Sequence, residues 1–389
     1  MFGIRLLPWE YGVRNLFRRP GRSALTLIAL TLVVLLVFVV VGFVRGLEAT
    51  LAVSGDPQVA LVHSLGASEA VEFSSIPEGN ANQVKNGLQG IQRRYDAVYA
   101  SPELYLGTRM TTEGDDEPTL GLARGVTPAA LLVRRRVQII EGHWPGPGEV
   151  LVGRLAATKL GRRAESLAIG RNVRFEGGSW RVSGWFASQG SALEAELWCP
   201  LNELQQAMKR QDISILAVTL APGAEFGDLD VFCKERLDLE LQATRETDYY
   251  ASLQRHYRPV RIMAWLMVCL IAGSGIFAGL NTMYGAVAGR VRELATLQTI
   301  GFVRRAIALS LVQEGTLLAA AASLLAAALA LVFINGLAIR FTMGAFVLRI
   351  DSIALLFGCS TGLLLGVIGA VPPAARVMQL SITDGLKSI

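Results

Sequence analysis

Four uncharged segments constrain this chain more than any other feature of its sequence. They cover 23–44, 262–289, 315–339 and 352–375, and none contains Asp, Glu, Lys or Arg. Each is longer than the roughly 20 helical residues that cross about 30 Å of hydrocarbon. Charged residues make up 18% of the chain, whereas ordinary soluble domains carry about a quarter. The pattern predicts an integral membrane protein with one span near its start and three near its end.

The first uncharged segment has an alternative interpretation as a secretory signal peptide. The apolar region of a signal peptide is roughly 7–15 residues long and is followed by a small-residue cleavage site. Residues 23–44 are longer, stand behind a basic leader, and precede no clean site of that kind. We therefore expect a retained membrane anchor.

Basic residues in the short loops predict the orientation, because cytoplasmic loops carry an excess of Lys and Arg. Arginine and lysine outnumber acidic residues before span one, between spans two and three, and after span four. This places both termini and the second connection in the cytoplasm. Residues 45–258 are then extracytoplasmic. The Arg134–Arg136 run does not count against this orientation, because long segments are exempt from the rule.

These features predict a membrane α-helical protein with four transmembrane helices in a 1+3 layout. An extracytoplasmic mixed α/β domain separates spans one and two. Apolar and basic residues at helical spacing before span one are typical of an amphipathic helix on the membrane face. We expect a cytoplasmic amphipathic helix at 1–22, span one at 23–44, the extracytoplasmic domain at 45–258, span two at 259–289, a cytoplasmic helix at 290–305, span three at 306–339, a short external loop at 340–351, span four at 352–375 and a cytoplasmic tail at 376–389.

Turn residues and alternating apolar positions predict the elements of the extracytoplasmic domain. We expect strands at 149–152, 172–175, 180–186 and 213–220, and helices at 81–93, 153–160, 201–209 and 227–237. The acidic segment around Gly114 is interpreted as a solvated loop.

The domain shows no residue pattern for catalysis or metal binding. Its histidines are scattered, no CxxC occurs, and we find no triad or paired-carboxylate pattern. Cys199 and Cys233 could form a disulfide outside the cytoplasm or stay separate, and both readings remain open. Cys269 and Cys359 fall inside spans, where cysteine serves as small apolar filler.

Small residues four apart mark two of the spans. Gly275 and Gly279 have this spacing in span two, and Gly358, Gly362 and Gly366 repeat it in span four. Such glycines let helix backbones approach closely. The contact could lie within one subunit or between two subunits, and the sequence favours neither.

Glu314 is a carboxylate near the cytoplasmic end of span three. Intramembrane carboxylates are often functional. Because Glu314 lies within about three helical turns of the cytoplasmic loop, we expect a structural hydrogen bond to a neighbouring helix rather than a proton relay.

The connection between spans two and three holds a short amphipathic helix. Leu294, Leu297 and Ile300 recur at i, i+3 and i+6, Gly301 ends the pattern, and basic residues follow. A helix of this length is marginal alone in water. It must rest on the membrane or on a partner protein.

This connection resembles a known element. The run from Glu293 to Leu297, followed by Ile300, Gly301 and Phe302, is similar to the coupling helix of FtsX-like permeases. These are the membrane subunits of MacB-type (type VII) ABC transporters, which include the lipoprotein-release permeases. Segments 14–27, 149–184 and 374–386 resemble, in the same order, the family's first span, extracytoplasmic core and C-terminal tail.

The resemblance implies roles for the connection. The apolar contact with an ATPase would come from Leu294, Leu297, Ile300 and Phe302, with Gly301 as the helix stop. The charged rim would come from Arg290, Arg292, Glu293, Arg304 and Arg305.

The resemblance also implies partners. The chain lacks the GxxxxGK[ST] phosphate-binding motif, so we expect no enzymatic activity and no cofactor in it. ATP and Mg²⁺ would act through two copies of a separate ABC ATPase subunit. A second permease subunit, identical or homologous, would complete the complex in a bacterial inner membrane. A periplasmic adaptor or a lipid or lipoprotein substrate would be further partners, and no nucleic acid is expected.

The expected function is an ATP-driven permease that moves its extracytoplasmic domain to export or extract a lipid, lipoprotein, peptide or amphipathic drug. The alternative is a signalling subunit that transports nothing and activates an extracytoplasmic partner such as a cell-wall hydrolase. A membrane-bound enzyme is disfavoured because no catalytic pattern is visible. An unrelated four-span protein with a receptor domain is the remaining interpretation.

Overall fold

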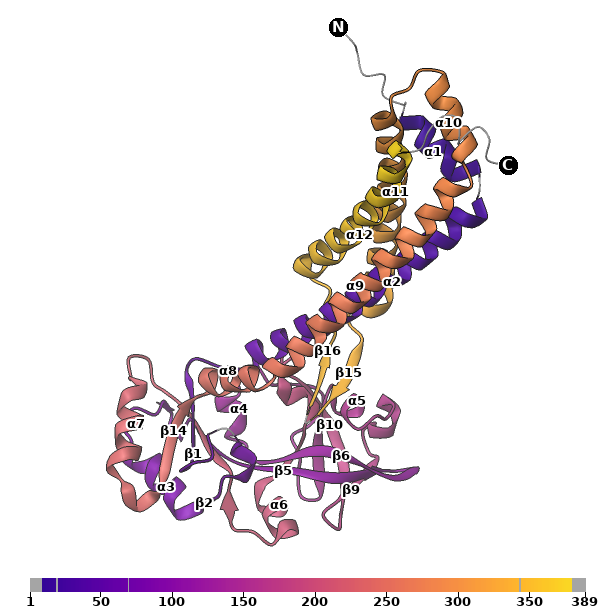
Figure 1. Cartoon of the computed structure of the whole chain (residues 1–389). Helices are drawn as coiled ribbons and strands as arrows, with labels where there is room; N and C mark the ends of the chain where they lie inside the picture. Colours follow the sequence, from indigo (N-terminus) through magenta and orange to yellow (C-terminus); the bar gives the residue numbers. More distant parts are fainter. Residues whose placement is uncertain (1–8, 19, 69, 343, 380–389) are drawn as a thin grey trace. The chain divides into compact units, whose positions relative to one another are not determined.

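The computed structural model describes residues 9–18, 20–68, 70–342 and 344–379, and they form two compact units (Figure 1). Within the described residues, the first unit comprises 9–45, 259–337 and 348–379, and the second comprises 46–258 and 338–347. The first unit is helical. The second is a mixed α/β domain.

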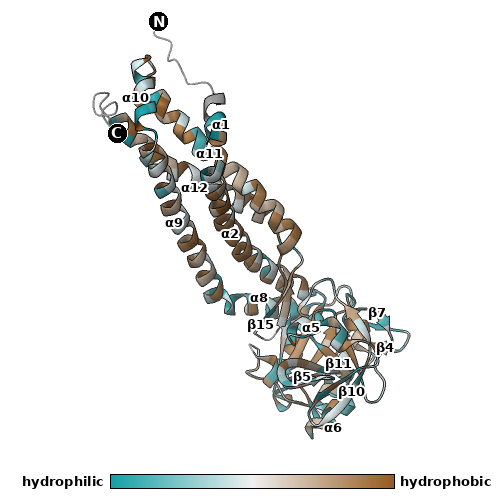
Figure 2. Cartoon of the chain, turned by 90° about the vertical axis from the view of Figure 1, so that its right-hand side faces the viewer, coloured by the Kyte–Doolittle hydropathy of each residue, from teal (hydrophilic) through white to brown (hydrophobic). Residues whose placement is uncertain are grey.

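Within the described residues, four helices are long and apolar enough to span a membrane (Figure 2). They are α2 (Pro20–Ser54), α9 (Arg258–Ala288), α11 (Arg304–Leu329) with its π-helical continuation (Ala330–Ile334), and α12 (Ser352–Gln379). Two shorter helices, α1 (Trp9–Arg18) and α10 (Val291–Thr299), complete the helical unit. The predicted fold class and its 1+3 layout are confirmed. The helix α2 continues for ten residues beyond the uncharged window that predicted it, which ends at Val44.

The five predicted packing glycines contact neighbouring helices of the same chain. A Cβ on Gly358 would overlap the Phe38 ring of α2, and one on Gly362 would overlap Ser323 of α11. Three more contacts involve Gly366 against Ala319, Gly275 against Val33 and Leu365, and Gly279 against Gly369. Close backbone approach within the subunit is therefore present at these glycines.

The α/β domain is built on a ten-stranded sheet whose middle closes into a barrel. The strand order is β14-β1-β13-β5-β6-β11-β8-β10-β7, and β9 pairs with both β10 and β5. The strands are β1 (Val59–Ser64), β5 (Ala100–Thr112), β6 (Asp115–Val126), β7 (Gln138–Gly142), β8 (Glu149–Gly153), β9 (Asn172–Phe175), β10 (Gly178–Ala187), β11 (Leu197–Pro200), β13 (Ile215–Thr219) and β14 (Leu241–Arg245). Because β9 bridges β10 and β5, the strands from β5 to β10 form a closed ring.

Helices cover both parts of the sheet. They are α3 (Glu78–Gly87), α4 (Ala130–Val133), α5 (Ala156–Lys159), α6 (Leu201–Met208), α7 (Phe226–Glu235) and α8 (Glu246–His256). The barrel interior forms one apolar core around Val150, Val152 and Trp180. A second core lies under α3 and α7, around Val62, Val84 and Leu229. Strands were therefore correctly predicted at β8, β9, β10 and β13, but the helix expected at 153–160 is only the single turn α5.

Two segments differ from their prediction. The acidic segment 113–117 is the tip of the long β5–β6 hairpin, and its Asp115 pairs with Arg162. The hairpin β15 (Ala338–Phe341) and β16 (Gly344–Val347) occupies much of the expected external loop at 340–351 and begins inside the expected span three at 306–339, whose helix ends at Ile334. This hairpin belongs to the α/β domain. Apolar packing on Leu155 and Ala195 holds this hairpin. The Lys159 ammonium also donates a hydrogen bond to the Thr342 carbonyl at 2.6 Å.

Candidate functional site

The helix α10, which lies between the second and third spans, ends at a C-terminal capping motif. Gly301 has a φ of +104°, in the region that favours glycine. Its N–H donates to the Gln298 carbonyl at 3.1 Å, and the Phe302 N–H donates to the Leu297 carbonyl at 3.1 Å. This pair of bonds is a Schellman motif, which satisfies carbonyls left free at a helix end. The sequence therefore terminates α10 sharply before α11 begins.

The apolar face of α10 packs mainly on its own chain. Leu294 is buried with Val287 and Ile307, and Leu297 and Phe302 pack against the same cluster. Ile300, by contrast, is 66% exposed. Of the four residues expected to contact a partner, Ile300 is thus the one with a large accessible surface. The surface that this short helix needs is supplied by α9, α11 and α12.

Arg290 and Glu314 form a buried ion pair between the start of α10 and α11. The guanidinium donates two hydrogen bonds to the carboxylate, at 2.8 and 3.0 Å. The two side chains are 8% and 6% exposed. Arg290 therefore departs from its expected place on a charged rim, because it is drawn inward by Glu314. This leaves Arg292, Glu293, Arg304 and Arg305 as the exposed charged residues around α10.

A second charged cluster lies inside the α/β domain. Glu103 of β5 is fully buried and contacts two guanidinium groups, those of Arg124 and Arg134. Arg124 also binds Glu196 through two hydrogen bonds, and Arg134 also binds Glu246. Burial raises the pKa of the Glu103 carboxyl, but Arg134 and Arg124 outweigh this effect and hold it below its ordinary value. All five groups therefore have an ion-pair partner within the cluster.

Two neutral side chains complete this cluster. The Trp198 indole N–H donates to Glu196 at 2.9 Å, and the Arg124 guanidinium lies 4.0 Å from the centre of the Tyr105 ring. A buried ion pair is costly unless its remaining hydrogen bonds are made, and here they are made. Because it joins β5, β6 and β11 to the first residue of α8, the cluster fixes that helix to the sheet.

Sequence reasoning missed this cluster. Its five charged members, at positions 103, 124, 134, 196 and 246, are far apart in the chain, and a charged residue in a strand ordinarily faces solvent. The one available signal was the Arg134–Arg136 run, which we had set aside as irrelevant to orientation.

The two cysteines of the domain are separate and reduced. Cys199 lies in the barrel core, and Cys233 lies in the core beneath α7. Burial raises the pKa of the Cys233 thiol to about 11, which keeps it protonated and unreactive. Across the described residues, no three His, Cys, Asp or Glu side chains gather to hold a metal ion.

Comparison with known proteins identifies the domain. The model of the MacB-like periplasmic core domain matches residues 23–229, more than half of the 389-residue chain. Comparison with curated proteins gave no match.

Three solved structures are similar in fold, each a domain of a larger protein. The periplasmic region of MacB from Actinobacillus actinomycetemcomitans is 11% identical with a TM-score of 0.39, and the match covers 52% of this chain and 94% of that one. The extracellular domain of the noncanonical ABC-type transporter YknZ from Gram-positive bacteria is 14% identical with a TM-score of 0.37, over 48% and 99%. A domain of a protein described as a permease from Porphyromonas gingivalis is 16% identical with a TM-score of 0.33, over 48% and 87%.

The family match and the four apolar helices together describe a multi-pass membrane protein with a periplasmic domain. The chain belongs to the family of membrane proteins defined by the MacB-like periplasmic core domain.

Proposed function

We propose that this chain is the permease subunit of a MacB-type ABC transporter, driven by a separate ATPase. The observation that carries the proposal is the helix α10. It is short, connects two spans, ends at a fixed stop, and presents Ile300 within a charged surface. A rigid element of this kind suits the transfer of force from a partner protein to the spans.

The electrostatics of α10 support a protein partner. Arg292, Glu293 and Arg305 are exposed around Ile300. An accessible apolar side chain within a charged rim is typical of a protein interface. The basic excess of this loop favours its location in the cytoplasm together with both termini, which is where an ATPase binds ATP and Mg²⁺.

The Arg290–Glu314 pair supports a mechanical role for α10. It joins the first residue before α10 to the third turn of α11 with two charge-assisted hydrogen bonds. Such bonds are short and directional. Displacement of α10 by ATPase closure would therefore move α11 with it, rather than bending the connection.

The output of this movement would be work by the periplasmic domain on an amphipathic substrate. We propose a lipid, lipoprotein, peptide or amphipathic drug, handled by two permease subunits and two ATPase subunits, with an adaptor as a further partner. The proposed orientation places both termini of each permease subunit in the cytoplasm.

The test is a charge placed on the accessible apolar residue of α10. Ile300→Glu in the full chain should insert and fold normally but lose the ATPase subunit that copurifies with the wild type. Val231→Glu on α7 is a matched control, because Val231 is 51% exposed and apolar but lies in the periplasmic domain. Retention of the ATPase and of its hydrolysis rate in the Ile300→Glu protein would refute the proposal.

A further inference from the structure

The ends of two helices meet on the Arg134–Arg136 run of the periplasmic domain. The helix α2 ends at Ser54, and α8 begins at Glu246. A Cβ on Gly55 would lie 2.9 Å from the Thr247 Cα, so the two ends touch directly. The Asp56 N–H also donates to the Glu246 carboxylate at 2.9 Å. The end of α2 and the start of α8 therefore meet within the domain.

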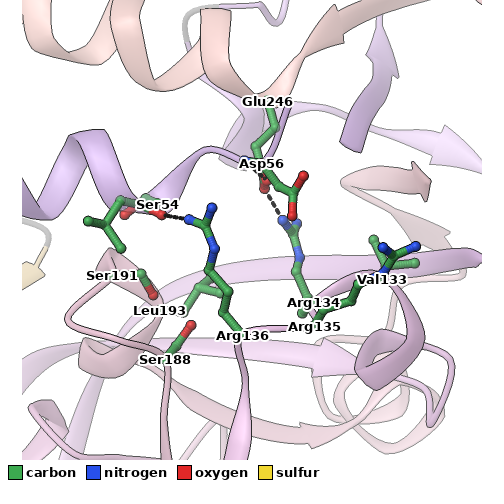
Figure 3. Close-up of a pocket in the computed structure, with 11 residues that line it drawn as sticks. Ser54, Asp56, Val133, Arg134, Arg135, Arg136, Ser188, Ser191, Leu193 and Glu246 are labelled. Carbon is green, nitrogen blue, oxygen red and sulfur yellow. Dashed lines mark hydrogen bonds and ion pairs between the residues drawn. The ribbon is translucent and has the colours of Figure 1, made fainter. Parts of the chain in front are cut away.

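Two of the three arginines bind these helix ends (Figure 3). Arg134 pairs with Glu246 at the start of α8 and with Glu103 on β5. Arg136 donates to the Val53 carbonyl in the last turn of α2. A cation suits this position because the carbonyl end of a helix carries partial negative charge. Arg135 differs from both, since it is exposed and reaches Gln58 and Gln92 instead.

Buried residues of α4 and a backbone hydrogen bond fix the position of the Arg134–Arg136 run. It follows α4, whose Ala130 and Val133 are buried, and the Val137 N–H donates to the Arg134 carbonyl at 2.9 Å. The first residue of η3 (Ala192–Ala195) adds a further link, since the Ala192 N–H donates to the Ser54 hydroxyl at 2.8 Å. The end of α2 is thus bound by two separate segments of the domain.

We propose that Arg134 and Arg136 are positioning residues that lock the ends of α2 and α8 to the barrel as one rigid joint. The proposal rests on the proposed function, because it names where motion of the spans enters the periplasmic domain. The joint consists of Val53, Ser54, Asp56, Arg134, Arg136 and Glu246. Movement of α2 or α8 then moves the barrel with it, because no hinge lies between these helix ends and the barrel.

The experiment uses Arg136→Gln in the full chain. Removal of Arg134 would leave the buried Glu246 without its ion-pair partner and would take one of the two guanidinium groups from Glu103, which threatens folding. Arg136→Gln avoids this because its partner is a backbone carbonyl. Arg135→Gln is the matched control, with the same change at the neighbouring exposed site. Arg136→Lys keeps the positive charge and should restore the wild-type behaviour in both measurements below.

The first measurement needs no ATP. Amide hydrogen exchange in the purified chain should rise roughly 10-fold at residues 54–56 in Arg136→Gln, because a hydrogen bond from a charged group is lost. Arg135→Gln should leave it unchanged. Equal exchange in Arg136→Gln and the wild type would overturn the proposal, whatever the chain transports.

The second measurement follows the distance between α2 and the barrel with and without trapped nucleotide. Spin labels at Ala52→Cys and Ser179→Cys, both exposed positions, report the distance from α2 to β10 after Cys269 and Cys359 are replaced by alanine. In the wild-type background this distance should be the same without nucleotide and after trapping with ATP and vanadate. In Arg136→Gln it should change on trapping, because the helix end moves without the barrel. A wild-type distance that already changes would show a hinge and overturn the proposal.

Failure of the proposed function would look different. An ATPase that remains bound and active with Ile300→Glu would refute ATP coupling through α10. The exchange measurement at residues 54–56 would still test whether Arg136 holds the end of α2.

Discussion

Neutralising Glu314 should weaken the cytoplasmic end of the bundle. The Arg290–Glu314 pair has two hydrogen bonds at 2.8 and 3.0 Å and is almost fully buried. Removal of one partner from a buried ion pair costs about 3–5 kcal/mol, because the other charge is left uncompensated. Replacement of both partners by apolar residues of similar volume is often close to neutral. The single and double variants should therefore behave very differently.

A double-mutant cycle separates these cases. We expect Glu314→Met and Arg290→Met each to lower the free energy of unfolding by about 3 kcal/mol or more. The double variant should recover most of that loss, which gives a coupling energy of at least about 2 kcal/mol. Equilibrium unfolding of the full chain in mixed micelles of rising denaturing-detergent fraction measures all four proteins. Additive single effects below about 1 kcal/mol would show that the pair is not the buried link described here.

Two further predictions concern His63 and Gly301. His63 is buried between the Ser64 carbonyl and the Thr244 hydroxyl, and burial lowers its pKa below the ordinary value of 6.5. The unfolded chain therefore takes up the proton first, so this residue's contribution to stability is lost as the pH falls below about 6.5. The stability difference between the wild type and His63→Gln should narrow between pH 7.5 and 5.5 in thermal melts, and a difference that does not vary with pH would contradict this. Gly301→Ala should cost about 1–2 kcal/mol because alanine is strained at positive φ. Gly301→Ala should also lower ATPase binding. The control for both the stability and the binding effect is Gly227→Ala, because Gly227 has no strained φ and has open space around it.

The sequence predicted best where one physical rule decides the outcome. Spans follow from uncharged length alone, so the 1+3 layout was predictable. Gly301 was predictable as a helix stop because an amphipathic pattern ends there. The strand β9 and the first part of β10 alternate apolar and polar residues in the expected way, and β8 is a short apolar run.

Features that depend on long-range contacts were not predictable. The β5–β6 hairpin contains Pro102, Gly107 and Gly121, which disrupt a strand pattern, although it is the longest hairpin of the sheet. The apolar face of α10 could equally have met a partner, and only the structure shows that Leu294 and Leu297 pack on their own chain. The charged cluster around Glu103 depends on five residues from separate elements. A charged residue gives no sequence signal for burial when its counter-charge lies far away in the chain.

The central claim is that α10 meets an ATPase through Ile300. A photo-reactive amino acid placed at position 300 in the full chain tests this contact in intact membranes. The account predicts an ultraviolet-dependent adduct with an ATP-binding subunit from position 300, and none from position 294, which faces the chain's own core. The absence of that adduct from position 300, with the chain correctly inserted, would contradict the account.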